Sequence, residues 1–238
     1  MTERRRGVAT LALACAAAVT VLAACAPLSP PPYATPSPVR ATPVADAGNG
    51  FSHAERLSLR VWATTCTSYR NGSAWMLDET HAVTNRHVVE GASVIELTDY
   101  RGTQYHGTTA AYSDEDDLAI VTIDGTFPEA ATIAQAEPEI GEALTVTGYA
   151  LGGPLETLTG PYVALRENDL DPAGAHVYYI EVEAREGNSG SPVTNGDGEV
   201  VGVVFSSDGE EFAGAVTLAR LRAFLDADDD RVPVDGTC

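Results

Sequence analysis

The 238-residue sequence contains no lysine, so all 14 of its basic residues are arginines, against 34 aspartates and glutamates. The formal net charge at pH 7 is −20. Because nucleic-acid binding needs basic surface to neutralise phosphates, this composition excludes nucleic acid as an expected partner. Either solubility of an exported domain or adaptation to high salt would account for the excess of acidic residues.

Long apolar runs are scarce as well. The run from Val8 to Val21 follows the basic residues Arg4-Arg5-Arg6 and is too short for an ordinary membrane span, so it has the form of an export signal. After it comes Leu22-Ala23-Ala24-Cys25, which resembles the lipobox of bacterial lipoproteins. We predict that residues 1–25 are a lipoprotein-type signal peptide and that lipidated Cys25 anchors the protein to the outer face of the cell membrane. The alternative is an ordinary cleaved signal and a secreted protein.

Residues 26–50 are rich in proline, including Pro30-Pro31-Pro32. Such a segment cannot bury enough apolar surface to order itself, so we predict a disordered, extended tether. The remaining residues 51–238 are enough for one domain with a sizeable core or for a pair of small barrels.

Cysteine is also rare. Of the four cysteines, Cys15 lies in the predicted signal and Cys25 is the predicted lipidation site, which leaves Cys66 and Cys238. Two thiols in an exported protein predict one disulfide, which would attach the C-terminus to the first β-segment. Two free thiols, or pairing between chains, are the alternatives.

Short β-like runs separated by turn residues fill most of the remaining chain, as in β-barrels and sandwiches. A capping-box pattern at Ser52 predicts a short helix from about Ala54 to Leu59, and Thr217 is expected to cap a final helix. The expected strands are Val61–Thr65, Ala74–Leu77, Ala82–Thr84, Ser93–Leu97, Tyr105–Ala111 and Leu118–Ile123 in a first unit, and Ala143–Gly148, Leu155–Leu165, Val177–Val182, Ser191–Val193, Val200–Phe205 and Phe212–Val216 in a second.

The stretch Gly187-Asn188-Ser189-Gly190-Ser191-Pro192 places a serine between glycines. Glycine permits backbone angles closed to other residues and leaves no side chain in the way, so a tight turn here can bring the backbone close to a reacting group. The amides of Gly187 and Ser189 would then form an oxyanion hole beside the Ser189 hydroxyl. The alternative is an ordinary turn between two strands.

Two further stretches favour the chemical interpretation. Ala82 to Val89 runs from a β-branched strand into His87, and Asp116 to Ile123 places carboxylates at the start of an apolar strand. The order His, Asp, Ser is that of the chymotrypsin-type triad. Together, Thr-Asn-Arg-His-Val-Val, Asp-Leu-Ala-Ile-Val and Gly-Asn-Ser-Gly-Ser-Pro resemble the trypsin-like serine proteases, specifically the bacterial HtrA/Deg branch, over roughly Val61 to Leu225.

This resemblance implies an all-β fold of two six-stranded antiparallel β-barrels of chymotrypsin type with a short C-terminal helix. It implies a serine endopeptidase in which Ser189 is the nucleophile, His87 the general base and Asp117 the orienting carboxylate. Protein or peptide substrates are expected, with no cofactor and no metal. No chain follows Cys238 for a PDZ domain, so we expect a bare protease domain, residues 51–238, that is monomeric. The alternative function is a catalytically silent binding protein of the cell envelope with the same fold.

Four consecutive acidic residues, Asp114 to Asp117, compete for the role of orienting carboxylate. The resemblance places it at Asp117. Alternation along the strand also places Asp117 with the apolar positions 119, 121 and 123, whereas Asp116 shares a face that tolerates a polar group.

The resemblance also locates a substrate pocket. Glu183 takes the position at its base, and Phe205 and Ser207 lie on the opposite wall. A carboxylate there would favour a basic residue before the cut. The alternative is a solvent-directed Glu183 and a small, apolar pocket.

Overall fold

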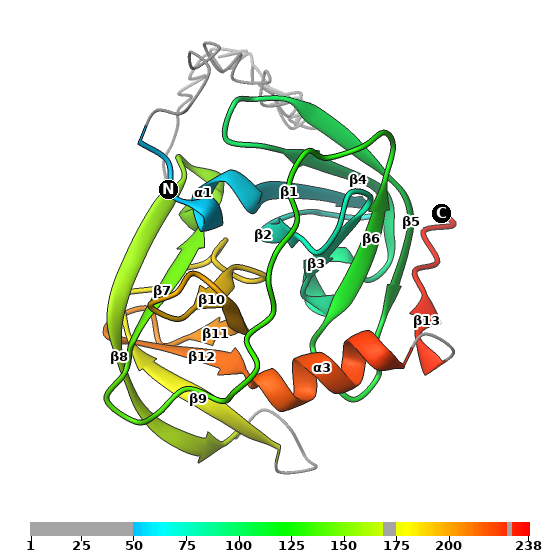
Figure 1. Cartoon of the computed structure of the whole chain (residues 1–238). Coiled ribbons are helices and arrows are strands. Elements are labelled where there is room, and N and C mark those ends of the chain that lie inside the picture. The colour runs from blue at the N-terminus through cyan, green and yellow to red at the C-terminus, as the bar shows by residue number, and fades with distance from the viewer. Residues whose placement is uncertain (1–49, 169–174, 228–229) are drawn as a thin grey trace, which may run out of the picture. The chain divides into compact units, whose positions relative to one another are not determined.

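The computed structural model describes residues 50–168, 175–227 and 230–238 (Figure 1). The predicted signal peptide, the lipidation site Cys25 and nearly all of the predicted tether lie outside the described residues. In the part of the chain that is described, no helix is both long and apolar enough to cross a membrane.

The first half of the described chain forms an antiparallel β-barrel. Its strands are β1 (Ser58–Thr65), β2 (Tyr69–Met76), β3 (His81–Thr84), β4 (Ala92–Thr98), β5 (Gln104–Tyr112) and β6 (Ala119–Ile123). They pair in the order β5-β4-β1-β2-β3-β6, and a further pairing between β5 and β6 closes the barrel. Helix α1 (His53–Leu57) precedes β1, the short helix α2 (Arg86–Val89) follows β3, and the C-terminal strand β13 (Val232–Pro233) is added to β5.

The second half forms another closed antiparallel barrel. Its strands are β7 (Ala143–Gly148), β8 (Glu156–Glu167), β9 (His176–Glu181), β10 (Pro192–Thr194), β11 (Val200–Ser207) and β12 (Phe212–Val216), paired in the cyclic order β10-β11-β12-β9-β8-β7. The 3-10 turn η1 (Ala150–Gly152) follows β7. Helix α3 (Leu218–Asp226) follows β12 (Figure 1). Two six-stranded barrels and a short C-terminal helix confirm the predicted fold class.

The structure confirms the expected strands and both expected helices, with shifts at their ends. The Ser52 capping box is present, and the Thr217 side chain caps α3. Strand β2 begins five residues earlier than expected, since its first three residues are exposed or half-buried and give no apolar signal. Helix α2 and strand β13 were not expected, because elements this short produce no periodic pattern.

Each barrel has its own core, and a third apolar cluster lies between them. Leu118 and Ile120, at the start of β6, pack with residues of β11 and β12 and with Leu221 and Phe224 of α3. The other face of β6 lies in the core of the first barrel. The face of β6 that carries Leu118 and Ile120 is therefore buried as well, because the second barrel and α3 cover it.

A disulfide joins Cys66, directly after β1, to Cys238, 172 residues later. Strand β13 pairs with β5 just before this bond. Both contacts attach the C-terminal segment to the first barrel, after the chain has completed the second one.

Candidate active site

His87 lies in the one-turn helix α2, directly after β3. The helix is anchored by Val88 and Val89, which are buried, while the His87 side chain is 48% exposed. Asn85, fully buried at the helix N-terminus, donates a hydrogen bond from Nδ2 to the Asp117 carbonyl at 2.6 Å. The sequence predicted a strand that leads into His87. The structure adds the helical turn that exposes the imidazole to solvent.

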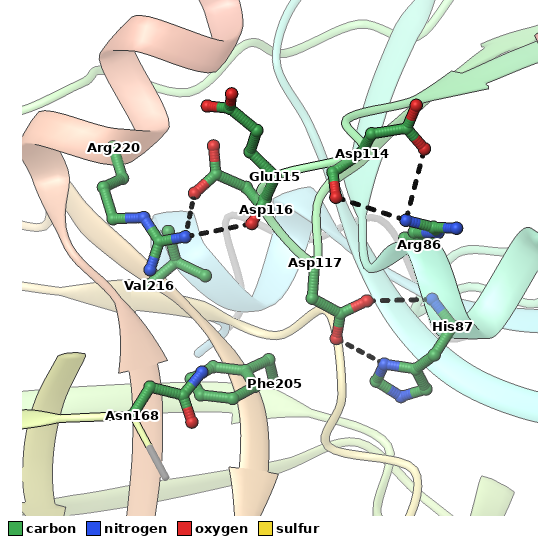
Figure 2. A pocket seen from close by; sticks show the side chains of 10 residues that line it. All are labelled: Arg86, His87, Asp114, Glu115, Asp116, Asp117, Asn168, Phe205, Val216 and Arg220. Carbon is green, nitrogen blue, oxygen red and sulfur yellow. Dashed lines mark hydrogen bonds and ion pairs between the residues drawn. The ribbon is translucent and has the colours of Figure 1, made fainter. Parts of the chain in front are cut away.

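The Asp117 carboxylate contacts His87 through both oxygens (Figure 2). Oδ1 accepts a hydrogen bond from the His87 backbone amide at 2.9 Å, and Oδ2 lies 2.5 Å from Nδ1 of the ring. Two contacts fix the position and the rotation of the imidazole. With Nδ1 engaged, Nε2 is the ring nitrogen that can exchange a proton with a substrate or a nucleophile.

The choice of Asp117 over Asp116 does not follow from burial. The Asp117 side chain is 27% exposed, whereas that of Asp116 is 13% exposed. Strand β6 begins only at Ala119, so strand alternation does not extend to either aspartate. The partner of His87 is the residue that the resemblance indicated, but the reason is the path of the loop before β6.

Ser189 lies in a tight turn that both barrels hold in place. Gly187 and Gly190 have φ values of 94° and 88°, which L side chains rarely adopt. Ser73 of β2 binds the turn twice, because its amide donates to the Ser189 carbonyl at 2.7 Å and its hydroxyl donates to the Gly187 carbonyl at 2.8 Å. The Ser73 hydroxyl also accepts a hydrogen bond from the Tyr149 amide at 2.9 Å.

The amides of Gly187 and Ser189 donate hydrogen bonds to no group in the described ranges. The carbonyl of Glu186 accepts a hydrogen bond from the Leu151 amide at 2.6 Å. Since N–H and C=O point in opposite directions across a trans peptide, this bond turns the Gly187 amide away from the η1 loop. Leu151 is itself the only non-glycine residue of the described chain with positive φ, at 55°. These two amides are therefore available to a ligand, as an oxyanion hole requires.

The His87 and Ser189 segments approach each other across Gly72 of β2. A Cβ atom at Gly72 would lie 2.7 Å from Cγ2 of Val88 and 3.2 Å from the Ser189 carbonyl oxygen. The structure describes no hydrogen bond between the Ser189 hydroxyl and His87, while it describes two between His87 and Asp117. A hydrogen bond between a catalytic serine and histidine is often long in unliganded enzymes and shortens when substrate binds.

The three predicted pocket residues have different environments. Phe205 lines a cavity of about 510 Å³ together with His87 and Asp117. The Glu183 side chain is 58% exposed and pairs with Arg185 at 2.6 Å. Ser207 donates its hydroxyl hydrogen to the Ala184 carbonyl. Of these three residues, only Phe205 therefore lines the cavity that contains His87 and Asp117.

The same cavity contains residues that sequence reasoning missed. Arg220 of α3, Asn168 at the end of β8, and Val216 of β12 line it beside the acidic loop before β6 (Figure 2). Arg220 is more than 100 residues from that loop in the sequence, and no local pattern connects the two. Across the described ranges, no group of three or more His, Cys, Asp or Glu side chains is arranged to hold a metal ion.

Comparison with known proteins decides the family. The sequence profile of the trypsin-like peptidase domain matches residues 72–203, more than half of the chain. The chain belongs to the trypsin-like peptidase family. The matched region extends from Gly72 of β2 to Val203 of β11, so it includes His87, Asp117 and Ser189.

Two relatives and one solved structure place this trypsin-like peptidase domain among bacterial proteins. Serine protease Rv3671c of Mycobacterium tuberculosis is 27% identical over 162 residues, which cover 63% of this chain and 40% of the relative. A glutamyl endopeptidase of Staphylococcus epidermidis is 29% identical over 174 residues, 63% of this chain and 59% of the relative. The crystal structure of the Rv3671c protease in its active form, at 22% identity, superposes with a TM-score of 0.69 over 78% of this chain and 86% of that one, which shows a shared fold.

Proposed function

We propose that the chain is an exported serine endopeptidase that hydrolyses peptide bonds of protein substrates through an acyl-enzyme. The observation that carries this proposal is the two-point contact between Asp117 and His87. The nearby turn of Ser189 adds a serine hydroxyl and two backbone amides that make no hydrogen bond in the described chain. Membership in the trypsin-like peptidase family supports it. The chain spans about two fifths of the Rv3671c protease, so activity and substrates are inferred for the domain itself.

In the proposed reaction Ser189 Oγ attacks the scissile carbonyl while Nε2 of His87 takes the hydroxyl proton. The Asp117 carboxylate holds the ring through Nδ1 and stabilises the imidazolium that forms. The Gly187 and Ser189 amides donate to the oxyanion, which contributes about 3–4 kcal/mol per donor in related chemistry. His87 then returns the proton to the leaving amine, and water attacks the acyl-enzyme by the same route.

The proposed location is outside the cytoplasm. The export signal in residues 1–25 and the disulfide between Cys66 and Cys238 support this location, since disulfides persist in oxidising compartments. Lipidation of Cys25 would add membrane anchoring through residues 26–50. Replacing Cys25 by Ala should move the protein from the membrane to the soluble fraction, and continued membrane association would show another anchor.

A fluorophosphonate probe tests the proposed catalysis, because it reacts only with an activated serine. We expect the wild-type protein to be labelled at Ser189 and the Ser189→Ala variant to remain unlabelled. A folded wild-type protein that takes up no label and hydrolyses no peptide would instead be a silent binding protein with this fold.

A further inference from the structure

Three of the four consecutive acidic residues before β6 have separate side-chain partners. Asp117 contacts His87, Asp114 pairs with Arg86 at 3.4 Å, and Asp116 pairs with Arg220 of α3 (Figure 2). Arg220 also donates from Nη2 to the backbone carbonyl of Glu115 at 3.3 Å. The loop therefore presents two carboxylates to arginines and one to the imidazole.

The Arg220–Asp116 ion pair is well shielded and joins the two halves of the molecule. The two side chains are 23% and 13% exposed. Asp116 belongs to the loop between two strands of the first barrel, whereas Arg220 lies on the helix that follows the last strand of the second barrel. Ion pairs this shielded are screened less than exposed ones, so removing one partner leaves a charge that solvent does not fully compensate.

Contacts from Ser113 hold both the ends and the middle of the loop, and Arg220 adds a contact from the helix that follows the second barrel. The Ser113 amide donates to the Leu118 carbonyl at 3.0 Å, and the Ser113 hydroxyl accepts from the Glu115 and Asp116 amides at 3.2 and 3.0 Å. Leu118 packs in the same cluster as residues of α3. The helix and the loop are thus in direct contact at the residue next to Asp117.

We propose that Arg220 is a positioning residue for the reaction: through Asp116 it holds the loop so that Asp117 faces His87, and it cancels the Asp116 charge beside the imidazole. This inference rests on the proposed hydrolase function. It adds to the triad a residue that reaches the site from the second barrel.

The charged groups of α2 and β2 near His87 have partners of their own. On α2, Arg86 binds Glu90 at 2.8 Å as well as Asp114, and its hydrogen bond holds the pKa of the Glu90 carboxyl below the usual range. From β2, Arg70 donates to the carbonyls of His87 and Glu90 at 2.9 and 2.8 Å. Loss of Arg220 would therefore add one net negative charge to the cavity, where Arg220 now faces Asp116.

The sign of the effect on catalysis follows from that charge. An added negative charge near the imidazole favours its protonated form, so the neutral base would appear only at higher pH. Loss of the Asp116 charge with Arg220 retained would act in the opposite direction. When both charges are removed together, the two opposite effects on the protonation of the imidazole should cancel.

The test compares the pH of half-maximal kcat/KM on the acidic limb for four variants on one peptide substrate. We expect Arg220→Gln to raise it by about half a pH unit and Asp116→Asn to lower it by a similar amount, with the double variant close to wild type. Arg220→Gln should also lower kcat about tenfold at little change in KM, because a small displacement of a catalytic group is costly. Arg220→Lys should recover most of the kcat and leave the half-maximal pH near the wild-type value.

Arg222→Gln is the matched control, since Arg222 is on the same helix and donates to the Ala134 carbonyl instead. It should leave the pH profile unchanged. Equal profiles for all variants, or shifts of one sign for Arg220→Gln and Asp116→Asn, would overturn the inference. If Arg220→Gln does not fold, the pH profiles of Asp116→Asn and Arg220→Lys still test the inference. An inactive, unlabelled wild type would contradict the proposed function instead.

Discussion

The two barrels contribute unequal parts of the candidate site. In the first barrel, His87 and Asp117 already contact each other through two hydrogen bonds. In the second barrel, the Ser189 hydroxyl and the amides of Gly187 and Ser189 make no hydrogen bond within the described chain. In the proposed mechanism, the acid–base pair is therefore assembled in the structure without substrate, whereas the proposed nucleophile and its oxyanion donors make no such contact.

Strand register explains the assembled half. Strands β3 and β6 are antiparallel neighbours, and Thr84 pairs with Ala119. The residues that follow β3 and those that precede β6 therefore lie at one edge of the sheet. His87 and Asp117 meet there through the pairing of two adjacent strands. The Ser189 turn depends instead on Ser73, a residue of the other barrel.

The largest expected effect comes from removing the nucleophile. Ser189→Ala should lower kcat by about 10⁶-fold, and His87→Ala by a similar factor, because triad members act as a unit. The free energy of unfolding should hardly change in Ser189→Ala, since its hydroxyl makes no hydrogen bond in the described chain. Peptide hydrolysis and urea unfolding measure the two quantities. Wild-type turnover in Ser189→Ala would contradict the protease assignment.

The next effect separates the two adjacent aspartates. Asp117→Asn should lower kcat by about 10⁴-fold, because an amide at this place favours the wrong imidazole tautomer. Asp116→Asn should lower kcat by less than about tenfold, because its amide oxygen can still accept from Arg220. The two kcat values at the pH optimum are the measurement. A large loss at Asp116 instead would mean that the loop before β6 is shifted by one residue.

The disulfide between Cys66 and Cys238 is expected to affect the stability of the fold and not the rate of catalysis. Because the two cysteines are 172 positions apart in the sequence, the loop-entropy estimate for the bond is about 5 kcal/mol. The Cys66→Ser, Cys238→Ser double variant should lose free energy of unfolding of up to this size in urea titrations. Intact mass after alkylation without reductant should show no modified thiol on Cys66 or Cys238 in the wild type, and two labelled thiols would end the disulfide assignment.

The rigidity of the serine turn depends on Gly190. A Cβ there would lie 2.0 Å from the Ser73 carbonyl oxygen, at a φ of 88°. Gly190→Ala should therefore cost about 3 kcal/mol or more of unfolding free energy. Gly196→Ala is the control, because a Cβ at Gly196 meets no atom within 4 Å, and it should change stability by less than about 0.5 kcal/mol. Equal stability of the two variants would show that the turn can rearrange.

The smallest effect is expected at Glu183. Its carboxylate is 58% exposed and pairs with Arg185, so it does not present a free charge to a substrate side chain. Glu183→Ala should leave the ratio of cleavage after Arg to cleavage after Val unchanged on a peptide library. A fall in that ratio would place Glu183 in the substrate pocket after all.

The sequence by itself determined the features that depend on neighbouring residues. The glycines around Ser189 predicted a turn with positive φ, the capping pattern at Ser52 predicted α1, and the apolar runs predicted the strands of both barrels. These signals are local, because backbone preference and strand alternation act over a few residues.

Tertiary structure decided the rest. The contact that selects Asp117 for His87, the burial of both faces of β6, and the pairing of Asp116 with Arg220 all join residues that lie far apart in the chain. Four adjacent carboxylates have nearly the same local preferences, so only the path of the loop and the charges that the other elements bring against it can give them different roles.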